Sequence, residues 1–289
     1  MRRDIAIVEF CVALCFSFST VVILYLISKT KSPRTLWKDS PPLFCLLMSV
    51  FFWTLSTSSI AAQWILFATE VFTVNPGNIL FVHYSGIAAV CIKRFYYCTT
   101  AGVYAQRLYY LAFPFSQPRH LNTLLVVVTL TASILSSASF VCVSVITTDF
   151  NVSLVSKDCH SFNYITTYTV LLKKISAAQE LTFLSITLVL GSLMDIIYRR
   201  LKSHFQSSRD LKINRFTRYL FFGQFILETT PYVTEMIVSS VIGTPLGVYI
   251  GPYGLVGGSI DSFTCTLAYY LITRNRSVKV KSSVDKGHT

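Results

Sequence analysis

Charged residues are scarce in this sequence: Asp, Glu, Lys and Arg make up 13% of its 289 residues, about half of the share in ordinary soluble domains. Hydrophobic residues account for 53% and include 22 Phe and 16 Tyr. A soluble fold would have to expose much of this apolar surface to water and would aggregate. The scarcity of charge therefore excludes an ordinary soluble protein and indicates an integral membrane protein.

The sequence also lacks the short motifs of common enzymes. It contains no HExxH, no GxSxG, no phosphate-binding glycine loop and no paired CxxC. The five histidines are scattered without metal-ligand spacing, and seven of the eight cysteines lie in apolar runs, where cysteine usually acts as a small apolar residue. We therefore expect no enzymatic activity, no catalytic residue, no metal and no cofactor.

Seven stretches are long and apolar enough to cross a bilayer, for which a helix needs about 20 residues. Backbone polar groups cannot stay unpaired in lipid, and the alternating pattern of a membrane barrel is absent, so these stretches must be helices. We predict an all-α membrane protein, a seven-transmembrane helix bundle that forms a single domain over residues 1–289. The expected spans are approximately 5–27, 43–67, 80–111, 121–146, 175–197, 216–242 and 245–272, and a short basic tail follows at 273–289.

Lys and Arg outnumber Asp and Glu by 25 to 13, and they collect after the first span, near the end of the third, between the fifth and sixth, and in the tail. This pattern is a topology signal, and we expect no nucleic-acid partner. It places the amino terminus outside and the tail in the cytoplasm. The sequon at Asn151 then lies outside and is a candidate glycosylation site, whereas the sequon at Asn275 falls in the tail and should stay unmodified.

Ionisable residues inside the spans are the most informative polar features, because such residues are costly in lipid and usually face a bundle interior or a cavity. Lys93 and Arg94 of the third span lie at a depth similar to Glu228 and Asp261. We hypothesise that one of the cations pairs with one of the acids, either as a structural lock or as the lining of a ligand cavity. The candidate ligand-binding residues are His83, Tyr84, Lys93, Arg94, Glu180, Glu228, Glu235 and Asp261.

Two further features concern the sixth span and the segment before it. Pro231 removes a backbone hydrogen bond from the sixth span and predicts a kink there. The segment between the fifth and sixth spans carries seven basic residues. They follow the positive-inside rule and attract anionic lipid, and they could equally form a docking face for a cytosolic partner.

The inner end of the third span contains Gln106 and Arg107, followed by a short apolar run and Phe113-Pro114. This stretch, and the junction from Asp261 to Arg276, resemble the corresponding regions of nematode serpentine chemoreceptors, a family of seven-transmembrane G-protein-coupled receptors. The Lys93-Arg94 pair is similar to the class BC group. Size and span lengths fit this family along the whole chain.

The resemblance implies a receptor that binds a small environmental molecule and activates a heterotrimeric G protein at the plasma membrane, in sensory cilia. It assigns the switch role to Arg107, beside which Gln106 replaces the usual acidic residue. The residues expected to act in switching and G-protein coupling are Gln106, Arg107, Arg199, Arg200, Lys212 and Arg215.

Two other functions remain open from the sequence. A ligand-gated cation channel of the insect odorant-receptor kind also has seven spans, but its amino terminus lies inside, against the charge bias. A small-solute transporter is not excluded, because glycines loosen the seventh span, although the chain shows no internal repeat. The location of the tail and a test of solute uptake would separate these functions from a receptor.

Overall fold

The computed structural model describes residues 3–72, 76–113, 120–147, 170–201, 208–242 and 252–284. These residues are almost entirely helical and contain no strand, so the predicted all-α class is confirmed. The elements are α1 (Arg3–Thr30), α2 (Pro33–Asp39), α3 (Pro41–Ala68), α4 (Pro76–Ala112), α5 (Leu121–Thr147), α7 (Val170–Leu201), α8 (Ser208–Gln224), the π-helix η3 (Phe225–Thr229), α9 (Thr230–Ile242) and α11 (Tyr253–Val284).

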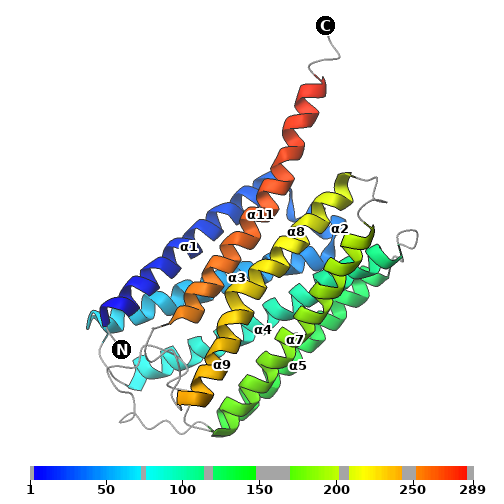
Figure 1. Cartoon of the computed structure of the whole chain (residues 1–289). Helices are drawn as coiled ribbons and strands as arrows, with labels where there is room; N and C mark the ends of the chain where they lie inside the picture. Colours follow the sequence, from blue (N-terminus) through cyan, green and yellow to red (C-terminus); the bar gives the residue numbers. More distant parts are fainter. Residues whose placement is uncertain are drawn as a thin grey trace.

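The long helices lie side by side in one bundle (Figure 1). Helix α1 packs against α3 and α11, while α4 contacts α3, α5 and α7 and therefore has neighbours on several sides. Helix α1 begins at one end of the bundle, and α11 leaves it at the opposite end and continues outward (Figure 1). Residues from 273 to 284, expected in the tail, are thus a continuation of α11, whereas 245–251 of the predicted last span lie outside the described residues.

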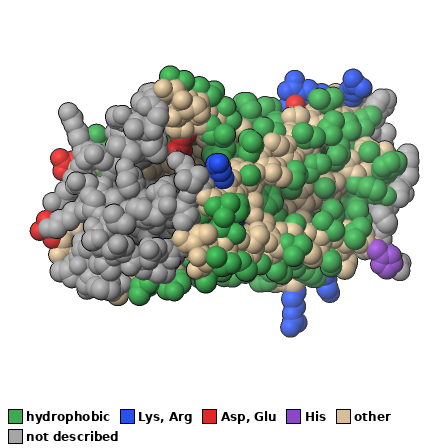
Figure 2. All heavy atoms as spheres, turned by 90° about the horizontal axis from the view of Figure 1, so that it is seen from below, with side chains coloured by type: hydrophobic (Ala, Val, Ile, Leu, Met, Phe, Trp, Pro, Cys, Tyr) green, Lys and Arg blue, Asp and Glu red, His purple; other side chains and the backbone are tan. Residues whose placement is uncertain are grey.

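Five helices of the described chain are long and apolar enough to cross a membrane, namely α1, α3, α5, α7 and α11. Large apolar side chains such as Phe18, Ile134 and Ile226 are exposed on the bundle exterior, and Figure 2 shows apolar side chains over the surface between the two ends. A bundle with this exterior needs an apolar surrounding. The two other predicted spans correspond to α4, which contains Lys93, Arg94 and Arg107, and to α8–η3–α9.

The segment from 208 to 242 is helical throughout but changes its winding in the middle. The backbone N–H of Thr230 donates to the carbonyl of Phe225, five residues earlier, as in a π-helix. Pro231 follows directly and has no N–H to donate. The sequence predicted a kink at Pro231. The structure has a local π-helical turn directly before this proline, and the helix continues on both sides of it.

The interior of the bundle is rich in aromatic residues at the end from which α11 projects. Tyr96 and Tyr104 of α4, Phe216 of α8 and Tyr269 of α11 are buried in one apolar cluster. The rings of Phe216 and Tyr269 meet edge to face at 5.5 Å between centroids. This packing fixes α4, α8 and α11 relative to one another and so sets the geometry of the polar groups between them.

Candidate functional site within the bundle

Helix α4 carries more of the buried polar side chains than any other described helix. Arg94, Thr99, Thr100 and Gln106 are all buried, although their backbone belongs to one helix of 37 residues. Because a lipid-facing polar side chain is costly, burial against neighbouring helices explains how a helix with this many polar residues can occupy the centre of the bundle. The candidate site is therefore built around α4.

Lys93 joins α4 to α7 through an ion pair with Glu180. Its Nζ atom lies 2.5 Å from Glu180 Oε1 and 5.4 Å from the centroid of the Tyr97 ring. The prediction that Lys93 pairs directly with Glu228 or Asp261 is therefore wrong. Glu228 nevertheless lies close enough to attract Lys93 electrostatically. Lys93 therefore forms an ion pair with α7 and is attracted more weakly by Glu228 in the segment α8–η3–α9.

Arg94 points in a different direction from its neighbour Lys93 and contacts α5. Its Nη1 donates to the carbonyl of Ser136 at 3.3 Å, and its guanidinium carbon lies 4.3 Å from the centroid of the Phe140 ring. Arg94 is buried, so a cation–π contact and a backbone acceptor compensate its loss of water. Among the described residues it has no ion pair with Glu228 or Asp261, so the predicted pairing is wrong for Arg94 too.

Glu228 belongs to the π-helical turn η3 and is buried. Its side chain interacts with that of Tyr97 on α4. Its Oε2 atom has no hydrogen-bond partner among the described residues. This oxygen can therefore accept a further hydrogen bond. Such a bond would be favourable, because a buried carboxylate oxygen without a partner costs free energy.

Asp261 of α11 is buried and accepts a hydrogen bond from the Tyr96 hydroxyl at 2.5 Å. Two turns further along α4, the Tyr104 hydroxyl donates to Gln224 Oε1 at 3.0 Å, and Gln224 Nε2 donates to Thr100 at 3.3 Å. These bonds connect α4 to both α8 and α11. Sequence reasoning did not single out Tyr96, Tyr104 or Gln224 as site residues, because neutral polar groups are common in membrane helices. For Tyr96, the available signal was its position two residues after Arg94, at the depth predicted for Asp261.

The remaining candidate ligand-binding residues lie at the other end of the bundle and do not form one pocket. Glu235 of α9 accepts a hydrogen bond from the Tyr253 hydroxyl at the start of α11. His83 is buried, whereas its neighbour Tyr84 is 58% exposed. Their rings meet edge to face with 5.6 Å between centroids, but Tyr84 lies on the exterior, so the two side chains do not line a common interior pocket.

Gln106 and Arg107 are both buried near the end of α4. Gln106 accepts a hydrogen bond from the Ser40 hydroxyl at 2.9 Å and donates to Asn122 Oδ1 at 2.6 Å, which ties α4 to the starts of α3 and α5. The guanidinium of Arg107 lies 5.8 Å from the centroid of the Tyr110 ring. Gln106 thus holds the end of α4 in place against α3 and α5.

Asp195 links the end of α7 to the middle of α8 and was not recognised from the sequence. One carboxylate oxygen lies 2.7 Å from Arg199 Nε, and the other lies 2.5 Å from Arg218 Nε on α8. Arg200 and Arg215 are exposed nearby. Lys212 belongs to α8, but its side chain lies outside the described part, and Asn151 falls wholly outside the described residues.

Figure 2 shows that most visible Lys and Arg side chains lie toward one end of the molecule. Among the described residues, no three His, Cys, Asp or Glu side chains gather as a possible metal site. The chain matches no protein-family model and no curated protein at a significant level. The geometry of the bundle is therefore the basis on which a function can be proposed.

Proposed function

We propose that this chain is a seven-helix receptor of the plasma membrane that binds a small molecule and activates a heterotrimeric G protein. In this proposal α4 and α8–η3–α9 are the two additional spans. At about 1.5 Å per residue, α4 is roughly 55 Å long and residues 208–242 roughly 52 Å, well above the ~30 Å hydrocarbon core. The burial of Arg94 and Arg107 inside the bundle is compatible with such a crossing.

The observation that carries the proposal is the position of Glu228. It sits in the π-helical turn of the sixth helical segment and faces the Lys93–Glu180 pair. π-helical turns occur frequently at functional sites, and Pro231 weakens the backbone bonding beside this one. A ligand that contacts Glu228 would interact directly with the most deformable part of that segment.

The mechanism follows from this coupling. A ligand that binds one arrangement of α8–η3–α9 more tightly shifts the population toward it by the difference in affinity. At the basic end, such a movement would separate α8 from α7 and break the contact between Arg218 and Asp195. Arg200 and Arg215, already exposed, would then border a basic surface for a G protein, as the resemblance to serpentine chemoreceptors implies.

Topology can be tested by glycosylation of Asn151→Gln and Asn275→Gln variants, followed by digestion with a glycosidase. A glycan lost only in Asn151→Gln supports an outside loop and a cytoplasmic tail. A glycan on Asn275 contradicts the receptor orientation and favours the channel. Absence of any native glycan would be resolved with sequons engineered farther from the bilayer.

Function can be tested by measuring nucleotide exchange on G proteins in membranes that contain the chain, during a screen of small volatile and water-soluble compounds. A response in the wild type that is lost in Glu228→Gln but kept in Asp4→Asn, an exposed acid at the start of α1, supports the proposal. A ligand-evoked ionic current without G protein would favour a channel, and accumulation of the compound in proteoliposomes would favour a transporter.

A further inference from the structure

The short helix α2 creates a hollow on the surface at the basic end of the bundle. The hollow has a volume of about 310 Å³ and is lined by Pro33, Arg34, Trp37, Lys38 and Phe44. Its walls are the rings of Pro33, Trp37 and Phe44 together with the aliphatic stems of the two basic residues. None of these five residues belongs to the candidate ligand site or to the proposed switch.

The local sequence explains why this face of α2 points outward. Ser32 caps the helix by accepting a hydrogen bond from the Thr35 backbone, and Pro33 occupies the first turn. Leu36 is buried in the main apolar cluster, so the opposite face must be exposed. Arg34, Trp37 and Lys38 share that face because they are three and four residues apart.

The walls of the hollow are held in place by neighbouring contacts. Trp37 is 44% exposed, and its ring packs edge-on against Phe44 with 5.6 Å between centroids. Ser40, directly after α2, is fixed by its hydrogen bond to Gln106. The aromatic wall is thus anchored to the core although it lies at the surface.

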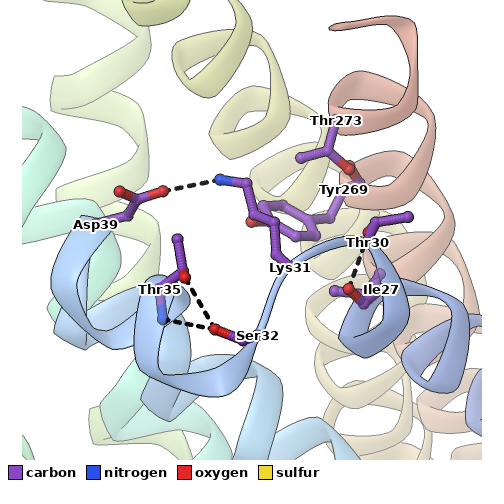
Figure 3. A network of polar contacts seen from close by, with 8 residues as sticks. All are labelled: Ile27, Thr30, Lys31, Ser32, Thr35, Asp39, Tyr269 and Thr273. Carbon is purple, nitrogen blue, oxygen red and sulfur yellow. Dashed lines mark hydrogen bonds and ion pairs between the residues drawn. The ribbon is translucent and has the colours of Figure 1, made fainter. Parts of the chain in front are cut away.

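The hollow has a net positive charge from Arg34 and Lys38. Asp39 is the only acidic residue between residues 29 and 44, and it forms an ion pair with Lys31 at 2.8 Å (Figure 3). Arg34 and Lys38 have no acidic partner among the described residues. Two cations therefore border an apolar concavity, and the one neighbouring carboxylate, that of Asp39, is already paired with Lys31.

The depth of the hollow fits the boundary between headgroups and acyl chains. Phe44 lies in the first turn of α3, which is apolar enough to span a membrane from Pro41 onward. Tryptophan is enriched at membrane interfaces, and Arg and Lys extend their charged groups from apolar surroundings toward the headgroups. The hollow therefore has its apolar wall beside acyl chains and its cations beside phosphates.

We propose that the α2 hollow binds an anionic phospholipid. Arg34 and Lys38 hold the negatively charged headgroup, and the upper part of one acyl chain lies against Trp37 and Phe44. A zwitterionic lipid would find the same apolar wall but would bring a cationic group beside two cations. The lipid site does not depend on the proposed receptor function or on the orientation of the chain in the membrane.

Trp37 provides a direct probe, because it is the exposed one of three tryptophans while Trp53 and Trp64 are 6% and 4% exposed. The full chain is reconstituted in nanodiscs that contain a small fraction of brominated-chain phosphatidylserine or, for comparison, brominated-chain phosphatidylcholine. Each basic residue near an anionic bilayer strengthens attraction about fivefold. Half-maximal quenching should thus need roughly 25-fold less phosphatidylserine than phosphatidylcholine.

Three variants assign the effect. Trp37→Phe should remove the lipid-dependent quenching, and the double variant Arg34→Gln with Lys38→Gln should remove the preference for phosphatidylserine. Lys29→Gln, an exposed basic residue at the same end that packs on Tyr25, should keep the preference. Equal quenching by both lipids in the wild type, or a preference that survives in the double variant, would overturn the proposal. Loss of the preference in Lys29→Gln would show general surface charge instead of a site.

Discussion

A single methyl group added at Gly257 should disturb the contact between α11 and the π-helical turn. A Cβ atom at this position would lie 2.8 Å from the carbonyl oxygen of Leu227. Close carbon–oxygen contacts between packed helices are about 3.3–3.6 Å, so the helices would have to separate by roughly 0.5–0.8 Å. The neighbouring atom belongs to the backbone and cannot rotate away, so Gly257→Ala should strain the packing by about 1–3 kcal/mol.

Gly254 in the same helix offers a matched control, because a Cβ atom there would have nothing within 4 Å. Both substitutions raise helix propensity, so this gain largely cancels when the two variants are compared. We expect Gly257→Ala to be less stable than Gly254→Ala by about 1–3 kcal/mol.

Thermal unfolding in detergent, followed by the reaction of a dye with the buried cysteine thiols, would measure the difference. If Gly257→Ala unfolds at the same temperature as Gly254→Ala or above it, the close approach of the two helices is not a constraint on the fold. If both variants lose stability equally, the cause is the loss of backbone flexibility in α11 and not the contact with Leu227.

Other contacts yield predictions of the same kind. Lys93→Met and Glu180→Met should each lower the free energy of unfolding by about 1–3 kcal/mol by isolating a charge, and the double variant should recover part of this loss; strictly additive losses would contradict the ion pair. Tyr96→Phe should cost about 1–3 kcal/mol in thermal unfolding by removing the donor to Asp261, and no change would argue against that bond. Asp195→Asn should speed hydrogen exchange in the part of α8 around Arg218, where unchanged exchange would show that the arginine contacts do not hold the helix.

The apolar helices could be predicted from the sequence because their length and composition are set by the bilayer, as α1 and α3 illustrate. Helix α2 was missed, since seven residues with flanking prolines resemble a loop; Ser32 before Pro33 was the signal for a helix start. The extension of α11 beyond residue 272 was missed because the basic residues there end the apolar pattern without ending the helix.

The partners inside the bundle could be predicted only in part. Depth along a helix can be read from the sequence, and it correctly selected Lys93 and Glu228 as neighbours in height. The direction in which a side chain points cannot be read in the same way, because the spans are apolar on most faces and no polar stripe marks the inner side. Glu180 therefore emerged as the partner of Lys93 only from the packing of α4 against α7.

The divergence of Lys93 and Arg94 has a mechanical consequence. Successive residues on a helix are separated by about 100° around its axis, and these two cations are held on different sides, by Glu180 on α7 and by Ser136 with Phe140 on α5. Rotation of α4 in either direction would pull at least one of them from its partner. The two cations thus resist rotation of α4 about its own axis. Rearrangements of the bundle therefore have to move the other helices relative to α4.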